Sequence, residues 1–206
     1  MAGRKIALFG GTFDPVHLGH TAVAEAARGL IGADKIIFIP ARRSPLKDSL
    51  PRASDDDRLA MLTLAIAGNE KFQLDDYELK KTKPSYTLNT IRHFWSLFGS
   101  DNSLYWLVGA DSVDELPHWY RVVELIDKCN LCVMIRAGYA APDFARFMPI
   151  WGSRRIQKLK HNIIQTPLID ISSTEIRNRL AAGLDVSDVL APSVADYIRI
   201  HRLYRL

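Results

Sequence analysis

Apolar residues recur along this chain with two different periods. Six short runs rich in β-branched and aromatic residues are typical of buried strands. They lie at residues 5–11, 35–41, 72–79, 103–110, 130–137 and 162–171. Between these runs, apolar residues follow helical spacing, which indicates amphipathic helices. The two clearest helical faces comprise Val23, Ala24, Ala27, Leu30 and Ile31, and Leu59, Leu62 and Ile66.

Strands that alternate with helices predict βαβ units. We therefore expect an α/β fold with an open, mostly parallel, Rossmann-like sheet and helices on both of its faces. The chain has 206 residues, of which 48% are hydrophobic, so it is long enough to bury a core and short enough for one domain over residues 1–206.

Composition narrows the cellular setting and the class of partner. No apolar run reaches 18 residues, so we expect no membrane partner, and Asp14, His17 and His20 interrupt the apolar start too early for a signal peptide. Two cysteines are too few for a disulfide framework, which favours a reducing cytoplasm. The net charge of +4 suits an anionic partner, either a nucleotide or a nucleic acid.

Three polar segments follow predicted strands. They are GGTFDPVHLGH at 10–20, GAD at 109–111 and SSTEIR at 172–177. Ligands of open parallel sheets bind beyond the carboxyl ends of the strands, where the strand order reverses. If the first and fourth runs flank that point, Gly10 and Gly11 face Gly109 and Asp111.

The first segment has the properties of an anion site. Its glycines allow backbone N–H groups to approach a phosphate, and the following helix offers unpaired N–H groups and a positive dipole end. It is neither a Walker loop nor a G-x-G-x-x-G fingerprint, because neither spacing occurs. His17 and His20, three residues apart, share one face of a helical turn. The alternatives are a purely structural role at the helix start and a zinc site, and the zinc site lacks an evident third ligand.

The compound pattern resembles a known family. GGTFDPVHLGH matches the G-x-F-x-P-x-H-x-G-H signature of the nucleotidyltransferases related to class I aminoacyl-tRNA synthetases, and ISSTEIR resembles their second signature. Within that superfamily the chain is similar, nearly from end to end, to the bacterial nicotinate-nucleotide adenylyltransferases. The additional matching stretches are PSYTLNT at 84–90, GADSVDELPHWYR at 109–121 and VADYIRIHRLY at 194–204.

The resemblance implies a single nucleotidyltransferase domain that joins ATP to nicotinate mononucleotide. The products are nicotinate adenine dinucleotide and pyrophosphate, in a step of NAD biosynthesis. His17 and His20 are then the catalytic residues, and Mg²⁺ arrives on the ATP phosphates, with no metal site of the protein's own. The implied ATP-binding residues are Gly10, Gly11, Thr12, Phe13, His17, His20, Lys47, Ser172, Ser173, Thr174 and Arg177. Lys47 lies in the weakest matching stretch, since Leu46 stands where the family often has histidine.

For the second substrate, the resemblance implies that Trp119 stacks on the pyridine ring and that the backbone near Tyr86 and Thr87 receives the carboxylate. Gly109 and Asp111 complete this expected acceptor site, with Asp111 bonding a ribose. Trp119 and Asp111 each have a structural alternative: a lone tryptophan is often a core residue, and an aspartate before Ser112 is often a helix cap.

Other patterns have structural explanations. Ser172 and Glu175 have the spacing of a capping box, which is compatible with an anion site. The side chains of Cys129 and Cys132 point to opposite faces if they lie on one strand. The basic residues are scattered, so we expect no nucleic-acid partner. Two other functions stay open: a sister transferase for nicotinamide mononucleotide or phosphopantetheine, and a catalytically idle nucleotide- or RNA-binding module.

Overall fold

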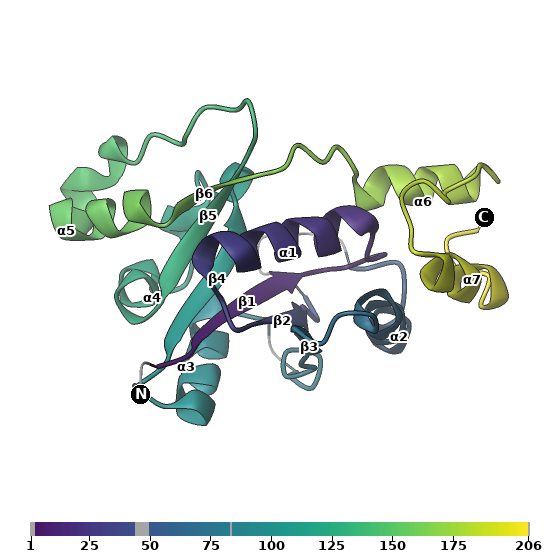
Figure 1. Ribbon diagram of the computed structural model, residues 1–206, viewed down its shortest axis with the longest axis horizontal. Helices are drawn as coiled ribbons and strands as arrows, with labels where there is room; N and C mark the ends of the chain where they lie inside the picture. Colours follow the sequence, from purple (N-terminus) through teal and green to yellow (C-terminus); the bar gives the residue numbers. More distant parts are fainter. Residues whose placement is uncertain (1–2, 44–49, 83, 206) are drawn as a thin grey trace.

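A computed structural model describes residues 3–43, 50–82 and 84–205 (Figure 1). Its strands are β1 (Lys5–Gly11), β2 (Lys35–Pro40), β3 (Phe72–Leu74), β4 (Ser103–Gly109), β5 (Asn130–Arg136) and β6 (Ile163–Thr166). Its helices are α1 (Leu18–Ile31), α2 (Asp55–Ile66), α3 (Thr87–Phe98), α4 (Val122–Lys128), α5 (Met148–His161), α6 (Ser173–Ala181) and α7 (Pro192–Ile200), with short 3-10 turns at 110–112, 116–118 and 145–147.

All six strands form one parallel sheet in the order β3-β2-β1-β4-β5-β6. The order reverses between β1 and β4, which are direct neighbours. The expected α/β fold is therefore confirmed, and the first and fourth runs do flank the point of reversal.

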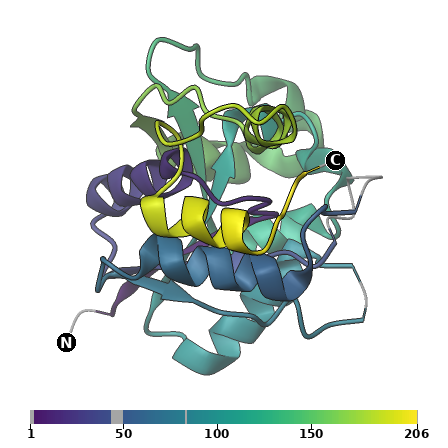
Figure 2. The same ribbon diagram turned by 90° about the vertical axis from the view of Figure 1, so that its right-hand side faces the viewer.

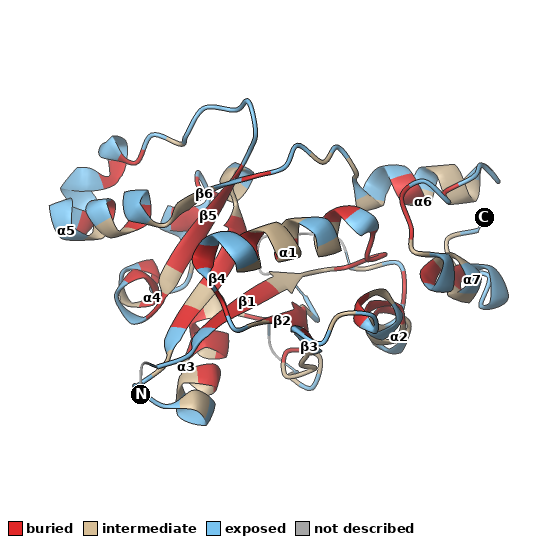
Figure 3. Ribbon diagram, in the orientation of Figure 1, coloured by how far each residue is buried: buried red, intermediate tan, exposed pale blue. Residues whose placement is uncertain are grey.

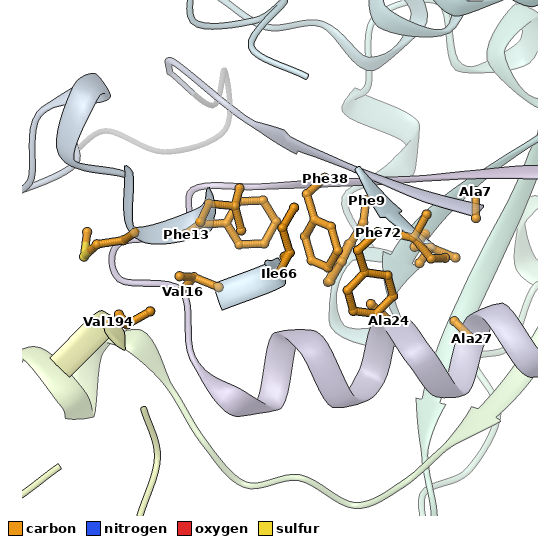
Figure 4. Close-up of a cluster of buried hydrophobic side chains, with 14 of the residues drawn as sticks. Ala7, Phe9, Phe13, Val16, Ala24, Ala27, Phe38, Ile66, Phe72 and Val194 are labelled. Carbon is orange, nitrogen blue, oxygen red and sulfur yellow. The ribbon is translucent and has the colours of Figure 1, made fainter. Parts of the chain in front are cut away.

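Alternation along β1 divides the core into two layers. Ala7 and Phe9 face α1 and α2, in a cluster that Figure 4 shows in close-up. Ile6 and Leu8 face the other side, where α3, α4 and α5 pack. Buried residues concentrate in the sheet and on the helix faces turned toward it (Figure 3). Strands β1, β2, β4 and β5 thus present apolar side chains to helices on both faces, whereas the edge strand β3 does so on one face only, since Gln73 is exposed.

Two strands are shorter than the sequence pattern predicts. β3 ends at Leu74 because the backbone N–H of Tyr77 turns back to Asp75 Oδ1, at 2.9 Å, rather than extending the ladder. β6 ends at Thr166 because Pro167 has no N–H to donate.

The two predicted helical faces are correct in their centres and wrong at one edge. In α1, Ala24, Ala27 and Ile31 are buried, but Leu30 is 57% exposed because it lies beside the buried stripe rather than on it. In α2, Leu62 and Ile66 are buried and Leu59 is half-buried.

The cysteines lie on opposite sides of the sheet. Cys132 packs in the layer of α1 and α2, whereas Cys129 packs in the layer of α3, α4 and α5. Burial raises the pKa of both thiols to about 12. Both side chains are therefore unreactive thiols of the core.

Candidate functional site

Three cavities meet at the carboxyl edge of the sheet, and Gly10 and Gly11 line all three. The tryptophan cavity, of about 460 Å³, is lined by Trp106, Trp119, Tyr86, Thr87, Glu78 and His118 among others. The arginine cavity, of about 640 Å³, is lined by His17, His20, Ser172, Ser173, Thr174 and Arg177 among others. The outer cavity, of about 700 Å³, lies between the two histidines and the ends of β5 and β6.

The glycines at this edge make room for neighbouring side chains. A Cβ on Gly10 would lie 2.4 Å from Trp106 Cζ2, and a Cβ on Gly109 would lie 2.3 Å from Asp111 Oδ1. Because backbone and side chain cannot both occupy that space, these positions admit only glycine without a rearrangement. The two glycines therefore shape the cavity walls from within, in addition to any role toward a ligand.

Phe13 fixes the loop that follows β1. Its φ of 50° lies in the left-handed region, which is unfavourable for a bulky residue. The side chain is buried and contacts the rings of Phe9 and Phe38 (Figure 4). It also contacts the ring of His20, and these two ring centroids are 5.0 Å apart. Core packing thus holds a strained backbone at the mouth of the arginine cavity.

His17 and His20 begin α1, and their ring centroids are 3.7 Å apart. The backbone N–H of His17 donates to Nδ1 of His20, at 3.2 Å. Since Nδ1 accepts this bond, the proton of a neutral His20 resides on Nε2, which is then a donor. His17 is only 8% exposed, and burial lowers its pKa to about 4. His17 is therefore neutral at pH 7 in the free protein.

The segment SSTEIR forms the start of α6 and contacts the first loop. Ser172 Oγ accepts from the backbone N–H of Glu175, at 3.1 Å, and so caps the helix as its spacing indicates. Ser173 Oγ donates to the carbonyl of Pro15, at 2.9 Å. Arg177 Nη2 donates to Thr174 Oγ1, at 3.0 Å. Capping and cavity lining thus coexist in one segment.

The expected acceptor residues divide between cavities. Tyr86, Thr87, Gly109 and Trp119 all line the tryptophan cavity. Trp119 also packs against the core layer of α3 to α5, so its core role and its cavity role are compatible. Asp111 lines the arginine and outer cavities instead, which places it beside the histidines.

Lys47 lies outside the described residues. Within the described part of the chain, no group of three His, Cys, Asp or Glu side chains could hold a metal ion. No helix described here is long and apolar enough to span a membrane.

Several polar residues of the site escape sequence reasoning. Arg58 is fully buried, and its Nη1 donates to the carbonyls of Thr12 and Ala41, at 2.6 and 2.8 Å, which ties α2 to the cavity mouth. Glu78 is buried beside Thr90, whose Oγ1 donates to Glu78 Oε1 at 2.5 Å. Of these two residues, only Arg58 could have been recognised as buried from the sequence, because it shares a helical face with Leu62 and Ile66.

Comparison with known proteins agrees with this geometry. The model of the cytidylyltransferase-like family matches residues 8–179. A probable nicotinate-nucleotide adenylyltransferase of Rhodopirellula baltica is 37% identical over 98% of this chain and 94% of its own length. One of Neisseria meningitidis serogroup B is 39% identical over 98% of each chain.

Solved structures share the fold. The Plasmodium falciparum nicotinic acid mononucleotide adenylyltransferase complexed with NaAD aligns with a TM-score of 0.74 at 21% identity, over 98% of this chain and 97% of that one. The same enzyme complexed with APC gives a TM-score of 0.71 at 20% identity, with the same coverage. From the family model and the curated relatives together, this chain belongs to the cytidylyltransferase-like family and, within it, to the nicotinate-nucleotide adenylyltransferases.

Proposed function

We propose that this protein transfers the adenylyl group of ATP to nicotinate mononucleotide, giving nicotinate adenine dinucleotide and pyrophosphate in NAD biosynthesis. The observation that carries the proposal is the meeting of the tryptophan and arginine cavities at Gly10 and Gly11. An aromatic pocket for a base thereby opens directly onto a pocket lined by histidine and arginine, so two phosphorylated substrates can meet there.

The chemistry needs positioning more than proton transfer. A phosphate oxygen of the mononucleotide attacks the α-phosphorus of ATP. The bond between this phosphorus and the oxygen that bridges the α- and β-phosphates breaks, and pyrophosphate leaves with the electron pair of that bond. The attacking phosphate is already largely dianionic at neutral pH, so no general base is required. The protein must align the two anions and stabilise the charge of the leaving group.

Arg177 and His20 have the character this task requires. The Arg177 guanidinium is a permanent cation at the wall of the arginine cavity. His20 offers an Nε2 donor because its Nδ1 is occupied by the His17 N–H. The neutral state of His17 in the free protein means that it serves as a hydrogen-bonding group first, and as a cation only where phosphate raises its pKa.

Mg²⁺ enters this scheme as part of the MgATP substrate. A nucleotide-bound Mg²⁺ takes most of its ligands from phosphate oxygens and water, so it neutralises charge without a dedicated protein site. In the proposed ATP site, Gly11, Thr12, Phe13 and the SSTEIR segment surround the phosphates, and Lys47 stays a proposed contact.

The tryptophan cavity is the proposed acceptor site. Trp119 supplies a ring face for the pyridine, and Thr87 is the first residue of α3, where backbone N–H groups lack intrahelical partners. Such donors suit a carboxylate. Asp111, at the junction of the cavities, is the proposed partner of a ribose hydroxyl. We place the whole activity in one domain, residues 1–206, in the cytoplasm.

The test is an assay of pyrophosphate release from MgATP with each acceptor in turn. Nicotinate mononucleotide is expected to give the highest kcat/KM, and the His20→Ala variant supplies the background. Faster release with nicotinamide mononucleotide or phosphopantetheine would identify a sister transferase. ATP binding without release from any acceptor would identify an idle nucleotide-binding module.

A further inference from the structure

The end of the chain returns to the loop that follows β1. Helix α7 lies alongside α2, and Figure 2 shows the two from the side of the molecule at which α6 and α7 lie. Beyond α7, the Tyr204 hydroxyl donates to Asp14 Oδ1 at 2.7 Å, across 190 positions of sequence. Asp14 belongs to the segment GGTFDPVHLGH and lines the arginine cavity.

Asp14 is a buried carboxylate that joins several segments. It is 4% exposed. Oδ2 accepts from the backbone N–H of Arg52, at 2.8 Å, and Oδ1 accepts from that of Ala53, at 3.1 Å, as well as from Tyr204. A buried carboxylate needs such donors, because each one that is lost leaves an acceptor without a partner.

Arg177 is held by the same residue. Its Nη1 donates to the backbone carbonyl of Asp14, at 2.7 Å, and lies 3.9 Å from Asp14 Oδ2. Without the Tyr204 hydroxyl, Asp14 Oδ1 would keep one donor, and the carboxylate would gain by rotating toward the guanidinium. Arg177 would then pair with Asp14 at the expense of a phosphate in the cavity.

The backbone and packing of the turn after α7 hold Tyr204 in this contact. Arg202 and Tyr204 have φ values of 53° and 61°, in the left-handed region that non-glycine residues adopt only where their surroundings hold them there. The Tyr204 ring packs against the core layer of α1 and α2. Burial and the adjacent Asp14 raise the pKa of Tyr204, so its hydroxyl stays a donor.

We propose that Tyr204 is a positioning residue of the ATP site: through Asp14 it holds Arg177 and the segment 51–53 in the geometry that receives the ATP phosphates. The last turn of the chain is therefore part of the phosphate site. The inference rests on the proposed function for the identity of the ligand, and it concerns a contact that neither sequence signature contains.

The test compares Tyr204→Phe with Tyr197→Phe. Tyr197 is a matched control, because its hydroxyl comes from the same C-terminal segment and also bonds an aspartate, but one other than Asp14: Asp57 Oδ1, at 3.0 Å. Calorimetry measures the Kd of MgATP, and the assay measures kcat and both KM values. We expect Tyr204→Phe to weaken MgATP binding about tenfold, the size of a lost bond to a charged group, with the KM of the mononucleotide within about twofold. Tyr197→Phe is expected to lower Tm comparably and to leave the Kd unchanged.

Equal MgATP affinity in the two variants would overturn the proposal. Whether Tyr204 acts through Arg177 is tested with the Arg177→Lys variant and the Arg177→Lys, Tyr204→Phe double variant. The Kd of MgATP is measured for every protein at a temperature below the lowest Tm of the set. If Tyr204 acts through Arg177, the double variant should bind MgATP no more weakly than Arg177→Lys alone. If the losses of affinity from the two substitutions simply add, this route is excluded. Calorimetry measures the affinity for MgATP even if the wild type releases no pyrophosphate. The role of Tyr204 and the proposed enzymatic activity can therefore be refuted independently of each other.

Discussion

The two histidines at the start of α1 lie with their rings side by side, yet their surroundings give them different chemistry. His20 is half-buried, and its Nδ1 accepts a backbone N–H. His17 is buried, and desolvation disfavours its charged form. A pair that looks symmetric in the sequence thus divides into a donor with a fixed tautomer and a neutral ring whose charge depends on the ligand.

His20→Ala is expected to lower kcat by about 10²-fold to 10³-fold, the size of the loss when one transition-state donor is removed. The KM of ATP should change less, because the contact strengthens as charge develops on the leaving group. Steady-state kinetics separates the two. His20→Asn, which can keep an acceptor for the His17 N–H, controls for the helix start, and His161→Ala controls for histidine loss at an exposed site. Near-normal kcat in His20→Ala would remove His20 from the catalytic residues.

His17 is expected to titrate near pH 4 in the free protein. In the unfolded chain it takes up a proton near pH 6.5, so the free energy of unfolding falls as the pH drops from 6.5 toward 4. The contribution is on the order of 3 kcal/mol, from 1.36 kcal/mol per unit of pKa. NMR of the ring carbons across this range measures the pKa directly, and saturating MgATP is expected to raise it. An ordinary pKa in the free protein would contradict the neutral state.

At the scale of elements, the start of α3 depends on a buried carboxyl group. Glu78, 3% exposed and in the turn after β3, accepts from Thr90 in the first turns of α3. This bond fixes the helix whose first residue lines the tryptophan cavity. Burial raises the pKa of Glu78. Burial thus disfavours the ionised form of Glu78, which lines the pocket proposed for an anionic acceptor.

Glu78→Gln is expected to gain stability relative to the wild type as the pH rises. Below about pH 4.5 the carboxyl is protonated in both folded and unfolded chains. Above it, the unfolded chain releases the proton while the folded chain retains it or ionises a buried group, so the wild type loses stability and the glutamine variant does not. The difference in Tm between the two proteins should therefore widen, in favour of the glutamine variant, as the pH rises from 4.5 to 8. Glu70→Gln is the exposed control, and a Tm difference independent of pH would refute the argument.

The elements also show what sequence reasoning can reach. The runs of apolar residues predict all six strands because buried parallel strands are apolar on both faces. The ends are harder to predict. β3 stops at Leu74 because Asp75 Oδ1 accepts the backbone N–H of Tyr77, and the buried Glu78 lies in the string DDYELKK, which looks like solvated surface. The contact of Asp14 with Tyr204 depends on how α7 packs, which no local pattern encodes.

At the scale of the molecule, the sheet order decides which substrates can meet. Because β1 and β4 are neighbours, the loop at 10–20 and the segment after Gly109 share one edge. The predicted histidines at the start of α1, SSTEIR at the start of α6 and Trp119 after the 3-10 turn at 116–118 converge there, in cavities that share Gly10 and Gly11. Asp111 lies with the histidines rather than with Trp119, because Gly109 and the 3-10 turn after it direct the aspartate toward the arginine cavity.

This arrangement separates acceptor affinity from acceptor choice. Stacking on Trp119 is available to any pyridine ring, and base stacking on an aromatic side chain contributes about 1–3 kcal/mol. Choice of the acid over the amide depends instead on donors at the start of α3, since a carboxamide presents its own hydrogens to them and leaves polar groups unpaired. Backbone donors at Thr87 cannot be deleted by a side-chain change.

Trp119→Ala should therefore reduce kcat/KM for nicotinate and nicotinamide mononucleotides together, by about 10-fold to 100-fold, while their ratio changes by less than about threefold. Trp119→Phe retains a smaller ring face and should recover part of the loss for both substrates. The measurement is kcat/KM for each acceptor with all three proteins. A collapse of the ratio in Trp119→Ala would mean that the indole itself selects the acid, and an amide preference in the wild type would mean that the start of α3 does not receive a carboxylate.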